Sequence, residues 1–235
     1  DPQYVTALDR RTGRIAWHRP RVAGRHSYST PLVLSEAMRP QLISAGGDRV
    51  VSYDPATGRE LWWCRYAGYS VVPRPVAGDG LVYVCTGYDR PSLLAIRTDG
   101  TGDVTSTHVA WQTSRAVPLN STPLLVEGNL YLLTDTGIAS CLDAATGRLH
   151  WRRRLAGRFA ASPLFVSGRI LAIAENGSTH LLAPGPRYKR LALNRLKGQV
   201  LATPAVTGNR LIVRLAGEVI CIAESGKPEV GSGKE

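Results

Sequence analysis

Residues Cys141–Trp151 read CLDAATGRLHW, and two closely similar stretches occur elsewhere in the chain. Residues 7–17 read ALDRRTGRIAW and residues 52–62 read SYDPATGRELW. In each copy a glycine follows an aspartate by four positions, and a tryptophan follows the glycine by four. The residues of this motif are Asp9, Gly13, Trp17, Asp54, Gly58, Trp62, Asp143, Gly147 and Trp151. A weaker copy runs from Ile96 to Trp111 with an insertion around residues 99–102, and a fifth near Leu182–Gly185 lacks the tryptophan.

A second repeat lies between these copies and ends in proline. Its members are Ser29-Thr30-Pro31, Ser121-Thr122-Pro123, Ala161-Ser162-Pro163 and Ala202-Thr203-Pro204, with Arg74-Pro75 as a weaker copy. The five prolines are spaced by 44, 48, 40 and 41 residues. Self-similarity with a period of about 40 to 50 residues is typical of propeller blades. The two interleaved repeats therefore predict a chain built from about five such units.

Each unit divides into four short strands separated by turn signals. One unit predicts strands at Pro123–Val126, Leu130–Thr134, Ile138–Leu142 and Arg148–Arg153. The turns between them contain Gly128-Asn129, Asp135-Thr136-Gly137 and Thr146-Gly147, which are typical hairpin residues. No window shows a sustained helical period. We therefore predict an all-β fold, a β-propeller of four-stranded antiparallel blades.

The motif of aspartate, glycine and tryptophan has a mechanical explanation. An aspartate at the end of a strand bonds the backbone two residues on, and glycine supplies the positive φ that closes the turn. The tryptophan then falls midway along the outermost strand, where its ring can cover the seam with the next blade. We expect Trp17, Trp62 and Trp151 to occupy equivalent buried places, which is a structural role and not a catalytic one.

These units resemble the repeats of the pyrroloquinoline-quinone-type (PQQ-like) β-propellers, whose tryptophan-docking motif reads A-x-D-x-x-x-G-x-x-x-W. Ala7, Asp9, Gly13 and Trp17 match every fixed position, and the other two copies differ only at the alanine. The resemblance implies one propeller domain over residues 1–224, followed by a solvated tail over residues 225–235. Because such propellers usually have seven or eight blades, it also implies that the chain is the C-terminal part of a longer propeller.

The composition limits the classes of partner. Lys+Arg 29 against Asp+Glu 18 gives a net charge of +11, and only four of the basic residues are lysines. We interpret this excess as an arginine-rich soluble surface and expect no nucleic-acid partner, because no basic cluster is interleaved with stacking aromatics. No apolar run is long enough for a membrane helix. The four cysteines form no C-x-x-C pair, and Cys141 and Cys221 lie in apolar strands where a free thiol is typically buried.

The loops expected on one rim of the propeller are the candidate binding site. They include the connections from the fourth strand of one blade to the first of the next. Tyrosine and arginine, which dominate protein–protein hot spots, are frequent there. The candidate partner-binding residues are Arg25, His26, Tyr28, Tyr69, Tyr88, Arg90, Arg158 and Phe159. The alternative is that these are ordinary exposed loop residues.

The same rim carries acidic residues that a quinoprotein dehydrogenase would use to bind calcium beside its quinone cofactor. The candidates are Asp48, Asp89, Asp135, Glu175 and Asn176. The alternative is that Asp and Asn simply suit the tight turns there. The vicinal disulfide often found in such enzymes has no counterpart here. The five histidines (His18, His26, His108, His150 and His180) occur singly without metal-ligand spacing.

Two functions follow from the resemblance. The first is a non-catalytic PQQ-like scaffold that binds a protein or peptide partner in the periplasm or cell envelope of a bacterium, without a cofactor. The second is a fragment of a PQQ-dependent dehydrogenase that oxidises alcohols or sugars with PQQ and Ca²⁺. We favour the first, and therefore predict no catalytic, cofactor-binding or metal-binding residue in this chain.

Overall fold

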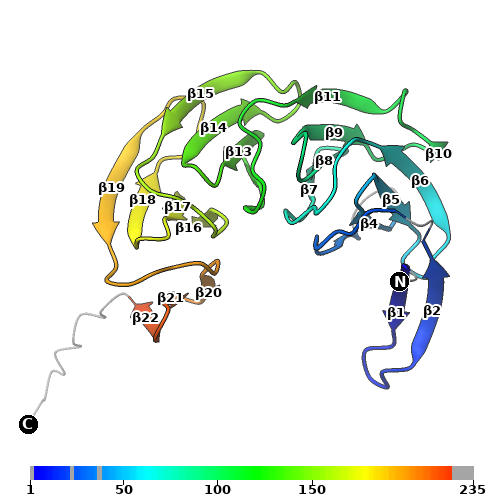
Figure 1. Ribbon diagram of the computed structural model, residues 1–235, viewed down its shortest axis with the longest axis horizontal. Helices are drawn as coiled ribbons and strands as arrows, with labels where there is room; N and C mark the ends of the chain where they lie inside the picture. The colour runs from blue at the N-terminus through cyan, green and yellow to red at the C-terminus, as the bar shows by residue number, and fades with distance from the viewer. Residues whose placement is uncertain (1–2, 22–23, 36–38, 224–235) are drawn as a thin grey trace, which may run out of the picture.

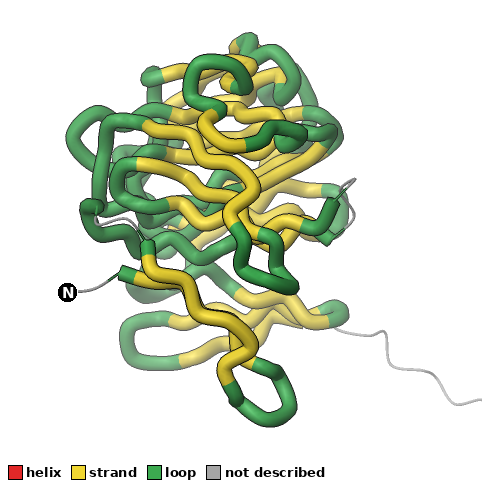
Figure 2. The backbone as a smooth tube through the Cα atoms, turned by 90° about the vertical axis from the view of Figure 1, so that its right-hand side faces the viewer, coloured by secondary structure: helices red, strands yellow, loops and turns green. Residues whose placement is uncertain are grey.

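The computed structural model describes residues 3–21, 24–35 and 39–223, and these residues form strands and loops without a helix (Figure 2). The all-β prediction is therefore confirmed. The strands form six sheets, which we number in chain order. The first sheet pairs β1 (Tyr4–Leu8) with β2 (Ile15–Pro20). The second contains β3 (Leu32–Leu34), β4 (Gln41–Ala45), β5 (Arg49–Tyr53) and β6 (Glu60–Arg65), with β10 (Gly102–Asp103) added parallel to β6.

The remaining sheets repeat the same antiparallel order. The third contains β7 (Val76–Gly78), β8 (Leu81–Cys85), β9 (Leu93–Arg97) and β11 (Val109–Thr113). The fourth contains β12 (Leu124–Val126), β13 (Asn129–Leu133), β14 (Ile138–Asp143) and β15 (Leu149–Arg154). The fifth contains β16 (Leu164–Val166), β17 (Arg169–Ile173), β18 (Ser178–Leu182) and β19 (Arg190–Arg195). The sixth contains β20 (Ala205–Thr207), β21 (Arg210–Arg214) and β22 (Val219–Ala223).

The sheets are arranged as blades of an open arc (Figure 1). The first strands of the blades line the inside of the arc, and β6, β11, β15 and β19 run along its outside. Apolar side chains fill the seams between neighbouring blades: Ile43 and Val50 of the second sheet share a core with Val84 and Leu94 of the third. Residues 1–2 and 224, at the ends of the expected domain, and the expected tail over residues 225–235 lie outside the described residues.

Each of three tryptophan rings packs against the turn that carries the aspartate–glycine motif, or its degenerate copy, in the next blade. Trp17 on β2 donates a hydrogen bond from Nε1 to the carbonyl of Pro55, at 2.8 Å, inside the turn that joins β5 to β6. A Cβ at Gly58 would lie 2.5 Å from Cε3 of this ring, so the indole requires glycine at that position. Trp111 bonds the carbonyl of Ala144 at 3.0 Å, and Trp151 bonds that of Gly185 at 3.2 Å.

Trp62 differs from Trp17 and Trp151: β10, within the insertion after residue 98, pairs with β6 at Trp62, and the indole bonds a side chain instead of a turn carbonyl. It is fully buried, and its Nε1 donates to Oε1 of Gln41 at 2.8 Å. Gln41 in turn donates from Nε2 to the carbonyl of Thr98 at 2.9 Å and accepts a bond from Ser52 at 2.7 Å. The buried glutamine thus connects the tryptophan to the next blade. No spacing in the sequence indicated this role for Gln41.

The proline-ending repeat supplies hydrogen bonds along the inside of the arc. The backbone N–H of Arg74 donates to Oγ1 of Thr122, at 3.1 Å, in the next blade. The N–H of Thr122 donates to Oγ of Ser162 at 2.9 Å, and that of Ser162 to Oγ1 of Thr203 at 2.9 Å. Proline fixes the chain where each first strand begins, while the preceding hydroxyl accepts a bond from the previous blade.

This chain of bonds gives a stability prediction. Replacing Ser162 with alanine is expected to lower the free energy of unfolding by about 1–2 kcal/mol, because the half-buried N–H of Thr122 loses its acceptor. Replacing Thr101, which is exposed and makes no side-chain hydrogen bond in the described structure, should change it by less than about 0.5 kcal/mol. Urea denaturation followed by circular dichroism measures both. Equal effects of the two substitutions would contradict the assignment.

Candidate functional site

Five of the eight predicted rim residues lie together at one end of the blades. We call Arg25, His26, Tyr28, Tyr69 and Tyr88 the aromatic rim. They come from three loops, which join β2 to β3, β6 to β7, and β8 to β9. The ring of His26 lies 5.6 Å from that of Tyr28 and 6.0 Å from that of Tyr69, measured between centroids. Tyr69 also contacts Tyr88 at 6.1 Å, and the guanidinium of Arg25 lies 5.1 Å above the Tyr69 ring.

Backbone hydrogen bonds hold the three loops against one another. The N–H of Tyr28 donates to the carbonyl of Val71 at 2.7 Å, and that of Ser70 donates to the carbonyl of His26 at 2.9 Å. The N–H of Tyr88 donates to the carbonyl of Tyr69 at 2.7 Å. Hydrogen bonds between the backbones of the three loops therefore position the rings before any partner binds. Such pre-organisation reduces the entropy lost when a partner binds.

The backbone of these loops contains several residues in the left-handed region. Ser70 has a φ of 55° and Asp89 a φ of 78°, which are unusual for residues with a Cβ. Gly68 and Gly87 approach neighbouring backbone so closely that a Cβ at either would lie within 2.4 Å of a carbonyl oxygen. Non-glycine residues in such conformations cluster at binding sites, where the surrounding structure enforces them.

The exposed surface of the aromatic rim is large and mixed in chemistry. Tyr28 is 67% exposed and Tyr88 is 55% exposed, while Tyr69 is half-buried at the centre of the group. Tyrosine rings offer rigid apolar area and a hydroxyl, and Arg25 adds a cation that is oriented by its ring contact. This combination suits a protein or peptide surface.

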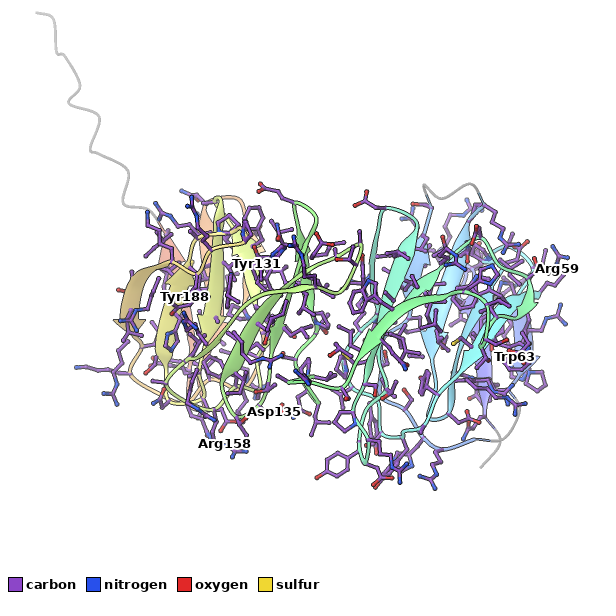
Figure 3. The ribbon with its side chains drawn as sticks, turned by 90° about the horizontal axis from the view of Figure 1, so that it is seen from above. Arg59, Trp63, Tyr131, Asp135, Arg158 and Tyr188 are labelled. Carbon is purple, nitrogen blue, oxygen red and sulfur yellow. The ribbon has the colours of Figure 1, made fainter. Side chains whose placement is uncertain are left out.

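The other three predicted rim residues make none of these ring or cation contacts. Arg90 is exposed in the same loop as Tyr88. Arg158 is exposed in the connection between the fourth and fifth sheets, where its Nε lies 4.0 Å from Oε1 of Glu175. Figure 3 shows it near Asp135 at one edge of the molecule. Including Phe159 was wrong: it is fully buried in the seam between the fourth and fifth sheets, with its ring 5.9 Å from that of His180.

The acidic residues of this face do not converge. Asp135, in the turn between β13 and β14, accepts hydrogen bonds from the N–H of Leu119 and from Nδ2 of Asn120, so it connects this turn to the loop between β11 and β12. Asp48 lies beside Arg49, and Glu175 lies beside Arg158. Across residues 3–21, 24–35 and 39–223, no three His, Cys, Asp or Glu side chains group closely enough to hold a metal ion.

Three of the four cysteines are buried thiols with raised pKa values. Cys64, Cys85 and Cys141 are buried, and burial raises the pKa of Cys64 and Cys141 to about 11 and that of Cys85 to about 12. Such thiols stay protonated at neutral pH and are poor nucleophiles. Cys221 is exposed on β22, so the expectation that it would be buried was wrong. The apolar residues of β22 are mostly exposed because no fourth strand or further blade covers them in the described structure.

His180 gives a pH prediction. It is fully buried on β18; Nε2 bonds the carbonyl of Ala156 at 3.0 Å, and Nδ1 has no partner. Burial lowers the pKa of His180, so the folded state favours the neutral ring. The unfolded chain binds more protons, and the free energy of unfolding should fall as pH drops below about 6.5. His180→Leu should flatten that fall between about pH 7.5 and 5.5. An unchanged pH slope in His180→Leu would contradict this.

A groove that the sequence did not indicate lies at the ends of the second and third blades. Its volume is about 1110 Å³, and its lining includes Leu34, Leu81, Arg97 and Asp99. The turn between β7 and β8 forms one wall, and the insertion after residue 98 contributes another. It shares no lining residue with the aromatic rim. The groove is therefore the natural comparison site for binding experiments.

The blades, their docked tryptophans and the loop-built rim together define a β-propeller of PQQ-like repeats. Residues 1–115 and 102–183 match the family model described as outer membrane protein assembly factor BamB. This match covers well over half of the chain, and the chain therefore belongs to that family.

Individual relatives are distant. The chain is 23% identical over 196 residues to outer membrane protein assembly factor BamB of Legionella pneumophila (strain Paris), which covers 79% of this chain and 47% of that protein. The chain thus spans about half the length of this curated relative. The described residues contain no helix long and apolar enough to cross a membrane.

Solved structures show the same fold at low identity. BamB from Moraxella catarrhalis matches with a TM-score of 0.50 and 18% identity, covering 93% of this chain and 78% of that one. Quinohemoprotein alcohol dehydrogenase from Comamonas testosteroni matches with a TM-score of 0.60 and 14% identity, covering 82% and 40%. The computationally designed Ika8 protein matches with a TM-score of 0.64 and 13% identity, covering 90% and 62%. These similarities concern the fold alone.

Proposed function

We propose that this protein is a non-catalytic scaffold that binds a protein or peptide partner at the aromatic rim. The observation that carries the proposal is the group of Arg25, His26, Tyr28, Tyr69 and Tyr88, which three different loops bring into contact. Residues of these types supply most of the binding energy in protein interfaces. Each is held by a blade that does not depend on it for its core, which suits a docking platform.

Family membership supports a location and a class of partner. The family is named for an outer membrane protein assembly factor, so we propose that the chain acts in the bacterial cell envelope and that its partner belongs to such an assembly. We also propose that the chain forms part of a larger propeller of seven or eight blades. The open arc of Figure 1 and the coverage of about half of the relative's length support this.

The test is capture of envelope proteins on the immobilised chain. We expect the intact chain to retain a partner and the double variant Tyr28→Ala/Tyr88→Ala to lose it, because both exposed rings leave the rim without removing buried contacts. The matched control is Tyr4→Ala, since Tyr4 is 58% exposed on β1, outside the rim. Retention by the rim variant with loss by the control would contradict the proposal.

A parallel assay separates the scaffold from the dehydrogenase. The chain is mixed with PQQ, calcium and a dye acceptor, and the oxidation of alcohols and sugars is followed. The scaffold proposal expects no turnover above that of the mixture without protein. Turnover that Asp135→Asn or Glu175→Gln abolishes would replace the proposal by the enzyme.

A further inference from the structure

The positive charge of this chain is concentrated in its C-terminal half. Residues 144–235 contain 15 basic and five acidic residues, whereas residues 1–143 contain 14 basic and 13 acidic residues. Residues 1–143 are therefore close to neutral, and the net positive charge lies in the residues that follow. Such asymmetry between halves is typical of proteins that bind a polyanion or an anionic surface.

The fold gathers six of these cations on the outside of the arc. We define the basic wall as Arg153, Arg154, Arg187, Lys189, Arg190 and Arg195, all of which are exposed. Arg153 and Arg154 lie on β15, and the other four lie on β19 or in the connection that leads to it. Both strands are the outermost of their blades, and they run along the outer side of the arc (Figure 1).

Contacts across the seam make the wall continuous. Tyr188, in the connection between β18 and β19, packs edge-on against Trp151 with ring centroids 5.2 Å apart. The guanidinium of Arg153 lies 5.9 Å from the centroid of the same Tyr188 ring. The two blades therefore present their cations side by side. Of the ion pairs within the described ranges, none involves a residue of the wall.

Apolar residues lie among these cations. On β19, Leu191 is 42% exposed and Leu193 is 50% exposed, between Arg190 and Arg195. Exposed leucines flanked by arginines suit the interface of a lipid bilayer, where the cations meet headgroups and the aliphatic chains enter the acyl boundary. A surface for nucleic acid would instead present free aromatic rings for stacking, and Tyr188 is already packed against Trp151.

We propose that the basic wall binds the surface of an anionic lipid bilayer. This binding is independent of the aromatic rim, which is formed by loops of the first three sheets. The attraction is electrostatic and supplemented by Leu191 and Leu193. It should therefore fall steeply with salt, because the Debye length shrinks from about 10 Å at 0.1 M to about 3 Å at 1 M.

The test is flotation of the full chain with vesicles containing about one third phosphatidylglycerol in phosphatidylcholine. We expect binding at low salt, loss at about 1 M salt, and none to pure phosphatidylcholine vesicles. The variant R153Q/K189Q/R190Q should bind about 100-fold more weakly, since each cation near such a surface contributes about fivefold. The variant L191S/L193S should bind about tenfold more weakly.

The matched control removes the same charge from the other half of the chain. R10Q/R11Q/R14Q alters three exposed arginines around the turn between β1 and β2, and we expect less than a threefold change. Equal weakening by the two triple variants would show that net charge alone is responsible and would overturn the proposal. So would absence of binding to anionic vesicles at low salt, or tighter binding to duplex DNA at the same phosphate concentration. The salt and lipid comparisons need no variant, so they hold even where a substitution disturbs folding.

Discussion

Replacing Trp62 with alanine is expected to lower the free energy of unfolding by about 3–5 kcal/mol, the largest loss from a single substitution that we foresee. Trp62 is fully buried in the core shared by the second and third sheets, with Ile43, Leu94 and Ile96. Its removal leaves a cavity and also takes away one of the bonds that Gln41 makes. The measurement is urea denaturation followed by circular dichroism.

The adjacent residue provides the control. Trp63 is half-exposed and lies between Arg49 and Arg65, with their guanidinium carbons 5.3 Å and 4.9 Å from its ring centroid. Such surface contacts contribute about 0.5–1 kcal/mol each, so Trp63→Ala should cost less than about 2 kcal/mol. If Trp62→Ala lowers the free energy of unfolding no more than Trp63→Ala does, the stabilising role of the buried Trp62 ring is wrong.

The second large effect concerns binding. Replacing Tyr69 with alanine is expected to weaken the binding of the proposed partner by at least about 30-fold. This factor corresponds to a loss of about 2 kcal/mol of binding free energy, as at a hot spot. Tyr69 contacts Arg25, His26 and Tyr88, so its loss removes one ring and the support of three neighbours. Titration of the captured partner with each variant gives the ratio of Kd values.

The conservative variant Tyr69→Phe separates the contribution of the ring to binding from any effect on folding stability. Tyr69→Phe keeps the ring, and the Tyr69 hydroxyl has no hydrogen bond in the described structure, so we expect a Kd within about fivefold of the unmodified chain. Both variants should unfold at similar urea concentrations, because Tyr69 lies outside the buried clusters. Normal binding by the Tyr69→Ala chain would show that the aromatic rim is not the binding site.

The blades could be predicted from sequence because their signals are local. Asp143 accepts hydrogen bonds from the N–H and hydroxyl of Thr146 at 2.9 and 2.7 Å, which lowers the pKa of its carboxyl, and Gly147 closes the turn at a φ of 72°. These interactions lie within four residues of one another, so spacing alone reveals them. The predicted strands of that unit agree with β12 to β15 within one residue at each end.

Long-range interactions could not be predicted in the same way. Gln41 precedes Trp62 by 21 residues and Thr98 follows it by 36, and no pattern connects these three positions. Phe159 was expected to be exposed because it lies in a loop, but that loop turns its ring into the seam between two blades, where His180 contacts it. The asymmetry of charge, by contrast, was present in the sequence and needed only a count by halves.

Site-specific photo-crosslinking in envelope extracts tests whether a partner protein binds at the aromatic rim. A photoreactive amino acid replaces Tyr88 on the aromatic rim, Asp99 in the groove, or Arg190 on the basic wall, one position at a time. We expect a discrete protein adduct from position 88 and none from position 99. The adduct should disappear when Tyr69→Ala is added to the same chain. An adduct from position 99 with none from position 88 would show that the partner binds at the groove and not at the aromatic rim.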